Sequence, residues 1–340
     1  MEKREMREED MISVVVCTYN QQDTIGRTLD SILMQQCHLP IEIVVGEDCS
    51  TDQTLSVCQK YAKEYPDKIR VLANKSNKGP VKNYFDCILA ARGKYIADCA
   101  GDDFWTDPQK LEKEVTILES HPEVTLVHTD WRSFDENTGK ISPSPAKPFT
   151  SPFTDGRQML EAIITQTTVP VIHLCTSLYL RAVIVEALQA DDYMFRDEFG
   201  CEDVQLSFVM AQQGVIAYLP DITLNYSQGH ESVSSSTDYE KVYRFTRQVT
   251  SLTFYIAQKY HITSPHMKTY FQQRSYAMLM CAFRLNSRSM LQDTLQLMKA
   301  WNVERNVQLR LLPAIMNSKT LWAMALTFRN AIVTLKKLFR

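Results

Sequence analysis

Short runs of β-branched and other apolar residues alternate with helical patterns over the first 130 residues, and this alternation limits the fold more than any other feature. The strand candidates are Ile12–Val16, Ile41–Val45, Ile69–Leu72, Tyr95–Ala100 and Val124–His128. Between the first two strands, apolar residues recur at helical spacing at Ile25, Leu29, Ile32 and Leu33. Strands and helices that alternate in this way form a mainly parallel sheet with helices on both faces. We therefore predict an α/β fold.

Two further helices are predicted from their terminal residues. Good N-cap residues at 50–52 precede a helix that carries Leu55 and Cys58 on its apolar face. The next helix begins at Pro80, where the missing amide proton costs nothing, and ends at Gly93.

The second half of the chain changes character. Val169–Leu180 and Ile216–Leu219 are strand-like, a helix follows Cys201 and ends at Gly214, and residues 225–232 resemble a loop. From Tyr239 onward the pattern is helical throughout. We predict an α/β domain over residues 1–235 and a helical C-terminal region over residues 236–340.

Composition narrows the class of protein. With 44% hydrophobic and 23% charged residues, the chain is typical of a folded globular protein. Its net charge of −3 argues against a nucleic-acid binder. The nine cysteines show no metal or redox spacing and are interpreted as reduced thiols. Neither a secretory signal nor a long uncharged apolar segment is found, so we expect a cytoplasmic protein, with attachment to the inner face of the plasma membrane left open.

Polar clusters follow three of the predicted strands, at the edge where ligands bind in parallel sheets. They are Cys17–Asn20, Glu47–Ser50 and the adjacent carboxylates Asp102 and Asp103. Two neighbouring carboxylates repel each other, and a pair of this kind can hold Mg²⁺ or Mn²⁺ together with substrate phosphate oxygens. The alternative interpretation is a solvated loop that caps a helix.

The chain lacks the glycine-rich motifs that cradle phosphates. Neither the dinucleotide-binding motif nor the P-loop motif occurs, and there are only 10 glycines. A phosphate bound here needs another source of positive charge, and a cation at Asp102 and Asp103 would supply it.

Several of these motifs occur together in one order. They are Val14–Asn20, Asp48–Asp52, Ala91–Ile96 leading to Asp102–Asp103, and Cys201–Asp203. As a set they resemble the family 2 glycosyltransferases with a GT-A fold, over roughly residues 11–232. The resemblance implies that residues 1–235 are a GT-A catalytic domain that binds a nucleotide sugar.

The resemblance also implies a nucleotide site. Carried over to this chain, the resemblance implies that Thr18 and Tyr19 would contact the nucleotide base. Asp48 would accept a hydrogen bond from the imide N–H of the base, which favours a UDP-sugar. Asp102 would lie near the ribose, and Lys82 near the nucleotide. Without the family, Asp48 is equally well interpreted as a turn residue that caps the next helix, and Lys82 as an exposed helix lysine.

The catalytic assignments come from the same resemblance. Asp103 would hold the Mn²⁺ or Mg²⁺ ion, and His230 would reach the metal or the diphosphate, although the arginine common just upstream in the family is missing. Asp203 would be the catalytic base and Glu202 would orient the loop or the acceptor. Acidic residues also favour a helix N-terminus in general, which is the structural alternative for Glu202 and Asp203.

The implied function is that of an inverting, metal-dependent glycosyltransferase of the hexosyltransferase class. It would move a sugar from a nucleoside diphosphate sugar to a hydroxyl of a glycan or lipid-linked acceptor in cell-surface polysaccharide synthesis. One alternative is a nucleotidyltransferase, which would release pyrophosphate instead of nucleoside diphosphate. The other is a catalytically silent scaffold that binds nucleotide sugars, against which the presence of both Asp103 and Asp203 argues.

The C-terminal end is basic and amphipathic. Residues 302–340 hold seven Lys and Arg residues and one acidic residue, Glu304. Apolar residues recur on one helical face at Leu321, Ala325, Phe328, Ile332, Leu335 and Phe339. A basic helix of this kind, with Trp322, can lie on an anionic membrane surface as a peripheral contact. The alternative is that its apolar face packs on the catalytic domain.

Overall fold

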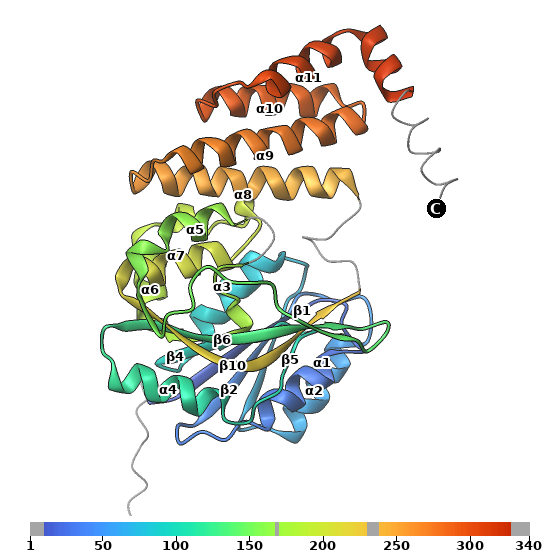
Figure 1. Cartoon of the computed structure of the whole chain (residues 1–340). Helices are drawn as coiled ribbons and strands as arrows, with labels where there is room; N and C mark the ends of the chain where they lie inside the picture. The colour runs from blue at the N-terminus through green and yellow to red at the C-terminus, as the bar shows by residue number, and fades with distance from the viewer. Residues whose placement is uncertain (1–9, 167–169, 230–237, 328–340) are drawn as a thin grey trace, which may run out of the picture. The chain divides into compact units, whose positions relative to one another are not determined.

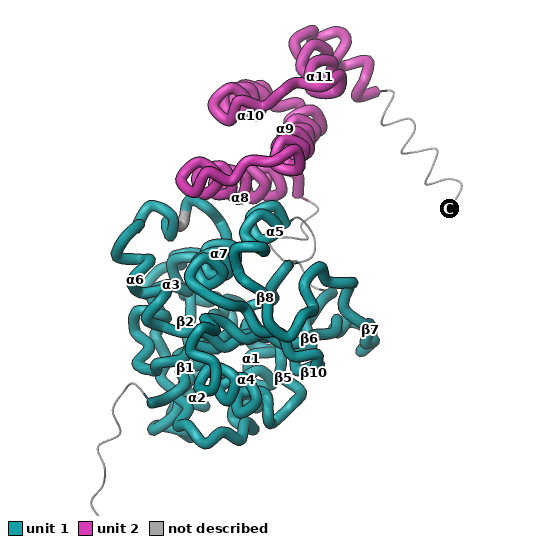
Figure 2. The backbone as a smooth tube through the Cα atoms, turned by 60° about the vertical axis from the view of Figure 1, so that its left-hand side comes forward, with its two compact units in different colours: residues 1–230 teal, residues 231–340 magenta. Residues whose placement is uncertain are grey.

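The chain divides into two compact units, residues 1–230 and residues 231–340, which Figure 2 shows in teal and magenta. The computed structural model describes residues 10–166, 170–229 and 238–327. The predicted division after residue 235 falls in the segment 230–237, which lies outside the described residues.

Four parallel strands form one half of the sheet in the first unit. They are β1 (Ile12–Thr18), β2 (Ile41–Glu47), β3 (Ile69–Ala73) and β4 (Tyr95–Asp98). β1 lies between β2 and β4, so that Val14 is opposite Ile43 on one side and Ala97 on the other. Val14, Val15 and Val16 are all buried because helices cover both faces of the sheet. The prediction of a mainly parallel α/β fold is confirmed.

The helices form a layer on each face of this sheet (Figure 1). On one face lie α1 (Ile25–Leu33), α2 (Thr54–Glu64) and α4 (Lys110–Ser120). On the other lie α3 (Pro80–Ala90), α5 (Leu160–Thr165), α6 (Arg181–Ala190) and α7 (Asp203–Gln213). The apolar spacing that predicted α1 places Ile25, Leu29 and Ile32 in the core beneath β1.

The second half of the sheet is mixed, and its strand order is β3-β2-β1-β4-β9-β6-β10-β5. The added strands are β9 (Ser177–Leu180), β6 (Val124–Asp135), β10 (Val215–Gln228) and β5 (Phe104–Trp105). β9 is antiparallel to both β4 and β6, whereas β6 and β10 are parallel. β5 comes directly after Asp102 and Asp103 and pairs with β10, so β10 fixes the position of the two carboxylates.

Two short strands complete the sheet, and two sequence predictions need correction. β7 (Ile141–Pro143) pairs with β6, and β8 (Phe153–Asp155) pairs with β10. Residue 169 of the predicted strand 169–180 lies outside the described residues, and of residues 170–180 only Ser177–Leu180 is a strand. Residues 174–176 form a single 3₁₀ turn. Residues 225–228, predicted as part of a loop, are the end of β10, where they pair with β6.

The described residues of the second unit form helices joined by short turns, and the helical residues include 319–327. Its helices are α8 (Tyr239–Lys259), α9 (Pro265–Arg284), α10 (Arg288–Ala300) and α11 (Val307–Asn317). Ser264, Ser287 and Asn306 cap three of them by accepting hydrogen bonds from the backbone. Its core includes Leu279, Met298 and Trp322. Among the described helices of the whole chain, none has both the length and the apolar character that crossing a lipid bilayer requires.

Candidate active site

Three loops at the carboxyl ends of β1, β2 and β4 are joined by hydrogen bonds. Asn20 adopts a left-handed conformation (φ 53°), and its amide Oδ1 accepts from the Thr51 backbone N–H at 2.8 Å. The Asn20 N–H donates to Ser50 Oγ at 3.0 Å. Gly101 lies so close to β1 that a Cβ there would be 2.7 Å from Thr18 Oγ1. The predicted convergence of the three polar clusters is therefore present in the fold.

Asp48 is buried in the loop after β2 and organises the approach to α3. Its Oδ1 accepts hydrogen bonds from Asn74 Nδ2 (2.9 Å) and the Lys78 backbone N–H (2.8 Å), and its Oδ2 accepts from the Gly79 N–H (2.9 Å). The helix that follows β2 is instead capped by Asp52, whose Oδ1 accepts from the Thr54 N–H. Asp48 is thus not a cap of α2, and a carboxylate oxygen has lone pairs for a further donor.

The other residues expected at the nucleotide differ in how far they are exposed to solvent. Thr18 is buried and its hydroxyl donates to Gln21 Oε1 at 2.8 Å. Tyr19, 45% exposed, is available to a ligand at the surface. The exposed Lys82 forms an ion pair with Asp86 at 2.9 Å, and Lys78 pairs with the same carboxylate at 2.6 Å. The role of Lys82 at the nucleotide stays a prediction.

Asp103 is held in the interior by β10. Its Oδ1 accepts a hydrogen bond from the Ser227 backbone N–H at 2.8 Å, and only 1% of the residue is exposed. Its Oδ2 is buried and has no hydrogen-bond partner among the described residues. Burial and the negative charge of Asp102 raise the pKa of Asp103 well above its ordinary value.

A divalent cation fits this arrangement. A buried carboxylate oxygen without a donor is an available ligand, and a nearby positive charge would favour the ionised form of a carboxyl group whose pKa is raised. Asp103 is therefore the residue of the pair best suited to hold Mn²⁺ or Mg²⁺. His230, the other predicted ligand, lies outside the described residues.

Arg27 of α1 is a positive group beside the carboxylates that the sequence analysis missed. Its Nη2 donates to the backbone carbonyl oxygen of Asp102 at 3.0 Å, and its guanidinium stacks on Phe104 at 4.1 Å from the ring centroid. Arg27 also pairs with Glu136. Its approach depends on how α1 packs against β5, which no local motif indicates.

Glu202 and Asp203 lie at the start of α7, as predicted. Both residues are partly exposed, and the Asp203 Oδ1 accepts a hydrogen bond from the Val204 N–H at 2.9 Å. Loss of hydration and the neighbouring charge of Asp203 raise the pKa of Glu202 to about 8. Loss of hydration also raises the pKa of Asp203. Because Glu202 holds its proton up to about pH 8, we assign the first ionisation of this pair to Asp203.

Electrostatic interactions connect Asp203 with the carboxylates a hundred positions earlier in the chain. Burial, followed by the charges of Asp103, Asp102 and Asp203, raises the pKa of the Tyr226 hydroxyl to about 12. Tyr226 lies on β10 next to Ser227, which holds Asp103. Tyr226 therefore lies one residue from the backbone group that holds Asp103.

A second buried carboxyl group, Asp98 at the end of β4, was also missed. Its Oδ1 accepts from the Tyr179 hydroxyl at 3.3 Å, and its Oδ2 has no hydrogen-bond partner among the described residues. Burial raises the pKa of Asp98 to about 7. In the sheet, Asp98 lies opposite Val15 of β1.

Three further polar or aromatic residues of the first unit, Trp105, Thr176 and His173, are largely enclosed by protein. Trp105 belongs to the core and donates from Nε1 to the Cys175 carbonyl oxygen at 2.8 Å. Thr176 is buried and donates to the His173 carbonyl oxygen. The His173 ring packs on Tyr226 at 4.9 Å between ring centroids, and burial lowers its pKa to about 4, so this imidazole is neutral at physiological pH.

Solved structures resemble the chain at the level of the fold. A crystal structure of S. aureus TarS residues 1–349 in complex with UDP-GlcNAc superposes with a TM-score of 0.58 and 20% sequence identity, over 84% of this chain and 81% of that chain. The mannosyltransferase PcManGT from Pyrobaculum calidifontis, in complex with GDP-Man and Mn²⁺, gives a TM-score of 0.52 at 18% identity, over 97% of this chain and 87% of that chain. The predicted GT-A-like fold is confirmed.

Sequence relatives match the N-terminal part of the chain. An uncharacterized protein of Mycobacterium tuberculosis is 40% identical over 134 residues, which are 39% of this chain and 39% of the relative. EpsE of Bacillus subtilis, whose name assigns it provisionally to the glycosyltransferases, is 35% identical over 163 residues, or 46% of this chain and 58% of the relative. The match thus spans well under two thirds of either relative.

The family model described as glycosyl transferase family 2 matches residues 13–187. This range holds β1 to β4, the Asp102–Asp103 pair and the Asp48 loop. Because the matched range is more than half of the chain, the protein belongs to glycosyl transferase family 2.

Proposed function

We propose that this protein is an inverting glycosyltransferase that moves one sugar from a nucleoside diphosphate sugar to a hydroxyl group of an acceptor. The observation that carries this proposal is the buried Asp103, held by the Ser227 backbone N–H with its Oδ2 free of a hydrogen bond among the described residues, where the loops after β1, β2 and β4 meet. The partly exposed Asp203, at the start of α7, is the second carboxylate of the proposal. One carboxylate suits a metal-bound diphosphate and the other an incoming hydroxyl. Membership of glycosyl transferase family 2 supports the same assignment.

The reaction needs a base on the acceptor side. The acceptor oxygen forms a bond to the anomeric carbon, the bond from that carbon to the diphosphate oxygen breaks, and the hydroxyl proton passes to Asp203. Glu202, which keeps its proton to about pH 8, can donate a hydrogen bond that orients the acceptor or the loop. The configuration at the anomeric carbon inverts because attack and departure occur on opposite faces.

The diphosphate end of the donor belongs at Asp103, with Asp102 near the ribose. A Mn²⁺ or Mg²⁺ ion bound there would offset the negative charge of the departing nucleotide. Asp103 would hold the ion, and Arg27 adds fixed positive charge beside the pair.

UDP is the favoured nucleotide of the donor. An aspartate can accept a hydrogen bond from the imide N–H of uracil, whereas cytosine presents an acceptor at that position. Asp48, held by three donors in a buried loop, is pre-positioned for this contact, with Tyr19 and Thr18 nearby in the loop after β1. The UDP-GlcNAc complex of the structurally similar TarS supports a uridine nucleotide.

The acceptor is proposed to be a glycan or a lipid-linked saccharide in the synthesis of cell-surface polysaccharide. One relative supports this setting by its name, which assigns TuaG of Bacillus subtilis provisionally to teichuronic acid biosynthesis; it is 33% identical over 108 residues, or 32% of this chain and 42% of that protein. A peripheral membrane contact through the C-terminal helical unit is part of the proposal. Leu321 and Met324 support it, because their side chains are 51% and 64% exposed.

A donor screen tests the proposed function. The purified chain is incubated with UDP-, GDP-, CDP- and dTDP-sugars in Mn²⁺ or Mg²⁺, and the released products are separated by chromatography. We expect UDP release from a UDP-sugar, stimulated by the cation and abolished by a chelator. Release of pyrophosphate from a nucleoside triphosphate and a sugar phosphate would instead identify a nucleotidyltransferase, and release of nothing, despite donor binding, would identify a silent binding protein.

A further inference from the structure

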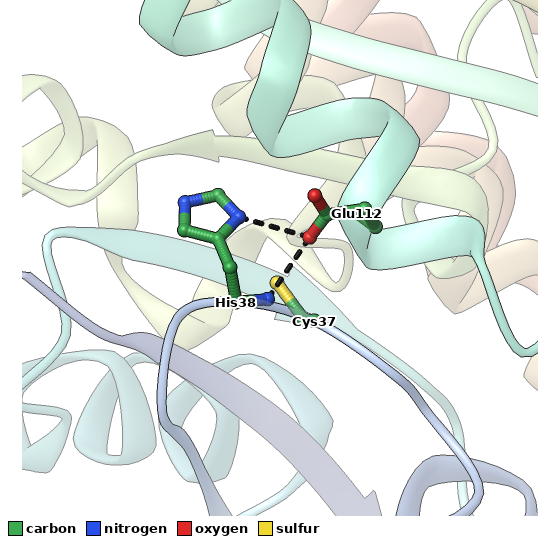
Figure 3. Close-up of side chains that lie close together, drawn as sticks. All are labelled: Cys37, His38 and Glu112. Atoms are coloured by element: carbon green, nitrogen blue, oxygen red, sulfur yellow. Dashed lines mark hydrogen bonds and ion pairs between the residues drawn. The ribbon is translucent and has the colours of Figure 1, made fainter.

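A cysteine, a histidine and a glutamate meet on the side of the first unit where α1 leads into β2. Cys37 and His38 lie in the loop between these elements, and Glu112 lies in the first turn of α4, as Figure 3 shows. One ligand atom from each of the three residues lies within 4.8 Å of the other two. The side chains are partly exposed, so an ion from solvent can reach them.

The three side chains already point at one place. Glu112 Oε2 accepts a hydrogen bond from the His38 backbone N–H at 3.0 Å and lies 2.9 Å from His38 Nδ1. The Cys37 thiol is the third member, because its Sγ lies within 4.8 Å of the ligand atoms of His38 and Glu112. Burial raises the pKa of this thiol to about 11. A cation bound between Cys37, His38 and Glu112 would take the place of the protons that these side chains share.

The other nitrogen of His38 has its own carboxylate. His38 Nε2 lies 3.4 Å from Glu119 Oε2, which is two helical turns after Glu112 on α4. Histidines that bind metals commonly donate their second ring N–H to a carboxylate, which fixes the tautomer and the ring orientation. A simple ion pair between His38 and Glu112 would require neither the carboxylate of Glu119 nor the thiol of Cys37.

We propose that Cys37, His38 and Glu112 form a Zn²⁺ site, with Glu119 as the partner of His38. A thiolate, an imidazole and a carboxylate together suit borderline Zn²⁺ better than Mg²⁺ or Mn²⁺, which prefer oxygen ligands. Three protein ligands leave one tetrahedral position for water. Binding releases a proton from Cys37.

This site is separate from the candidate active site and independent of the proposed function. Arg27, at the start of α1, contacts Asp102, whereas Cys37 follows the other end of the helix. Nine helical residues span roughly 13 Å. The same loop is already tied to the segment after β5, because Gln35 Nε2 donates to the Asp107 carbonyl oxygen and the Gln36 N–H to that of Pro108. Zn²⁺ would fasten this connection and stabilise the position of α4.

Metal titration of the whole chain tests the proposal. The protein is stripped of metal with a chelator and titrated with Zn²⁺ in competition with a chromogenic chelator. We expect Cys37→Ser, His38→Ala and Glu112→Gln each to weaken one tight site by at least about 100-fold, and Glu119→Gln by about 10-fold. Asp103→Asn should leave the tight site intact, which separates it from the active-site cation.

Two matched variants control for unspecific binding. His121 lies 3.3 Å from Glu123 at the other end of α4, without a cysteine, so His121→Ala should leave the affinity within twofold. Cys49→Ser removes another partly exposed thiol and should do the same. Equal affinity in the parent and in Cys37→Ser would overturn the proposal.

Cobalt gives a readout that does not depend on any variant folding. Co²⁺ added to the metal-free parent should produce a thiolate-to-cobalt charge-transfer band that Zn²⁺ displaces. Zn²⁺ should also raise the melting temperature of the parent but not that of Cys37→Ser. If Co²⁺ produces no thiolate band in the folded parent, the cluster is only a histidine–glutamate ion pair and the proposal is wrong.

Discussion

Asp203 is the single residue on which the proposed chemistry depends most. We expect Asp203→Asn to lower kcat by about 10²- to 10⁴-fold, because the amide cannot take the proton of the acceptor hydroxyl. The affinity for the donor, measured by calorimetry with the UDP-sugar, should stay within twofold because the proposed role of Asp203 is on the acceptor side. Full activity of the variant would contradict the mechanism.

The pKa values of the same pair predict how the rate depends on pH. kcat/KM should rise with pH as Asp203 ionises, because only the carboxylate acts as a base. It should fall again above about pH 8, where Glu202 loses its proton and its hydrogen-bond donor. Glu202→Gln cannot ionise, so its profile should keep the rise and lack the fall. If the Glu202→Gln profile matches that of the parent over the whole pH range, another group causes the fall in kcat/KM above pH 8.

Asp98 predicts a pH dependence of stability. Its pKa is about 7 in the folded protein against an ordinary value of 3.8, so between these values the folded state binds more protons than the unfolded state. The free energy of unfolding therefore falls as pH rises through this range, by up to a few kcal/mol.

Asp98→Asn isolates that contribution from other titrating groups. The amide does not ionise, so the variant should gain stability relative to the parent on going from pH 5 to pH 8, as measured by urea unfolding at both values. Any constant cost of the new amide donor cancels in this comparison. A difference between variant and parent that does not change with pH would mean that Asp98 ionises as readily in the folded protein as in the unfolded one.

At the residue scale, the sequence could reveal groups whose chemistry shows in a local pattern. Asp102 and Asp103 are neighbours at the end of a strand, and their chemistry alone suggested a cation. Arg27 and Asp98 were missed because their positions depend on tertiary packing. Arg27 reaches Asp102 from α1, and Asp98 contacts Tyr179 of β9.

Among the elements, the turns after β1 and β4 lie in contact at Gly101. A Cβ at this position would be 2.4 Å from Gln21 Oε1 and 2.7 Å from Thr18 Oγ1, so Gly101→Ala must push the two turns apart. We expect a loss of about 1–3 kcal/mol in stability and a weaker affinity for the donor, because Tyr19 and Asp102 flank the displaced backbone. Thermal unfolding and donor calorimetry measure the two effects.

Gly139 supplies the control for this variant. It lies in the turn before β7, and no atom of the described residues lies within 4 Å of the position that an alanine methyl group would take, although its φ of 67° strains any side chain. Gly139→Ala should therefore lower stability slightly and leave the affinity for the donor unchanged. If both variants lower donor affinity equally, contact between the two turns is not the cause.

The elements also show where sequence patterns reach their limit. The parallel strands β1 to β4 were predicted because buried strands need unbroken apolar runs. Residues 225–228 were predicted as a loop because their side chains are polar, yet pairing with β6 keeps their backbone extended. Strand partners that are remote in the sequence determine the structure of such segments. In this protein that matters because the Ser227 backbone N–H holds Asp103.

For the molecule as a whole, each of the two units has its own hydrophobic core. The first is centred on β1 and α1, whereas the second joins α9, α10 and α11 with Trp322. For the helix that carries Trp322, the sequence left membrane contact and packing on protein as alternatives; Trp322 itself is 2% exposed, and its Nε1 donates to the Phe283 carbonyl oxygen at 3.1 Å. Any membrane contact of this unit must therefore use other side chains.

Within residues 319–327, Leu321 and Met324 are the large apolar residues that are exposed and so available to a membrane. They are exposed beside Lys319, in a part of the chain that is rich in basic residues. We expect the full chain to sediment with vesicles that contain anionic lipid and to do so less at high salt. Leu321→Asp combined with Met324→Asp should lower the bound fraction several-fold at an unchanged melting temperature, because neither side chain belongs to the core.

The control for this double variant replaces an equally exposed apolar residue on a helix of the other unit. Leu89 of α3 is 55% exposed, so Leu89→Asp adds a negative charge without touching the C-terminal unit. It should sediment with anionic vesicles as the parent does, apart from a small general effect of charge. If the double variant binds as well as Leu89→Asp, the exposed leucine and methionine make no membrane contact, and the enzyme must meet a lipid-linked acceptor by another surface.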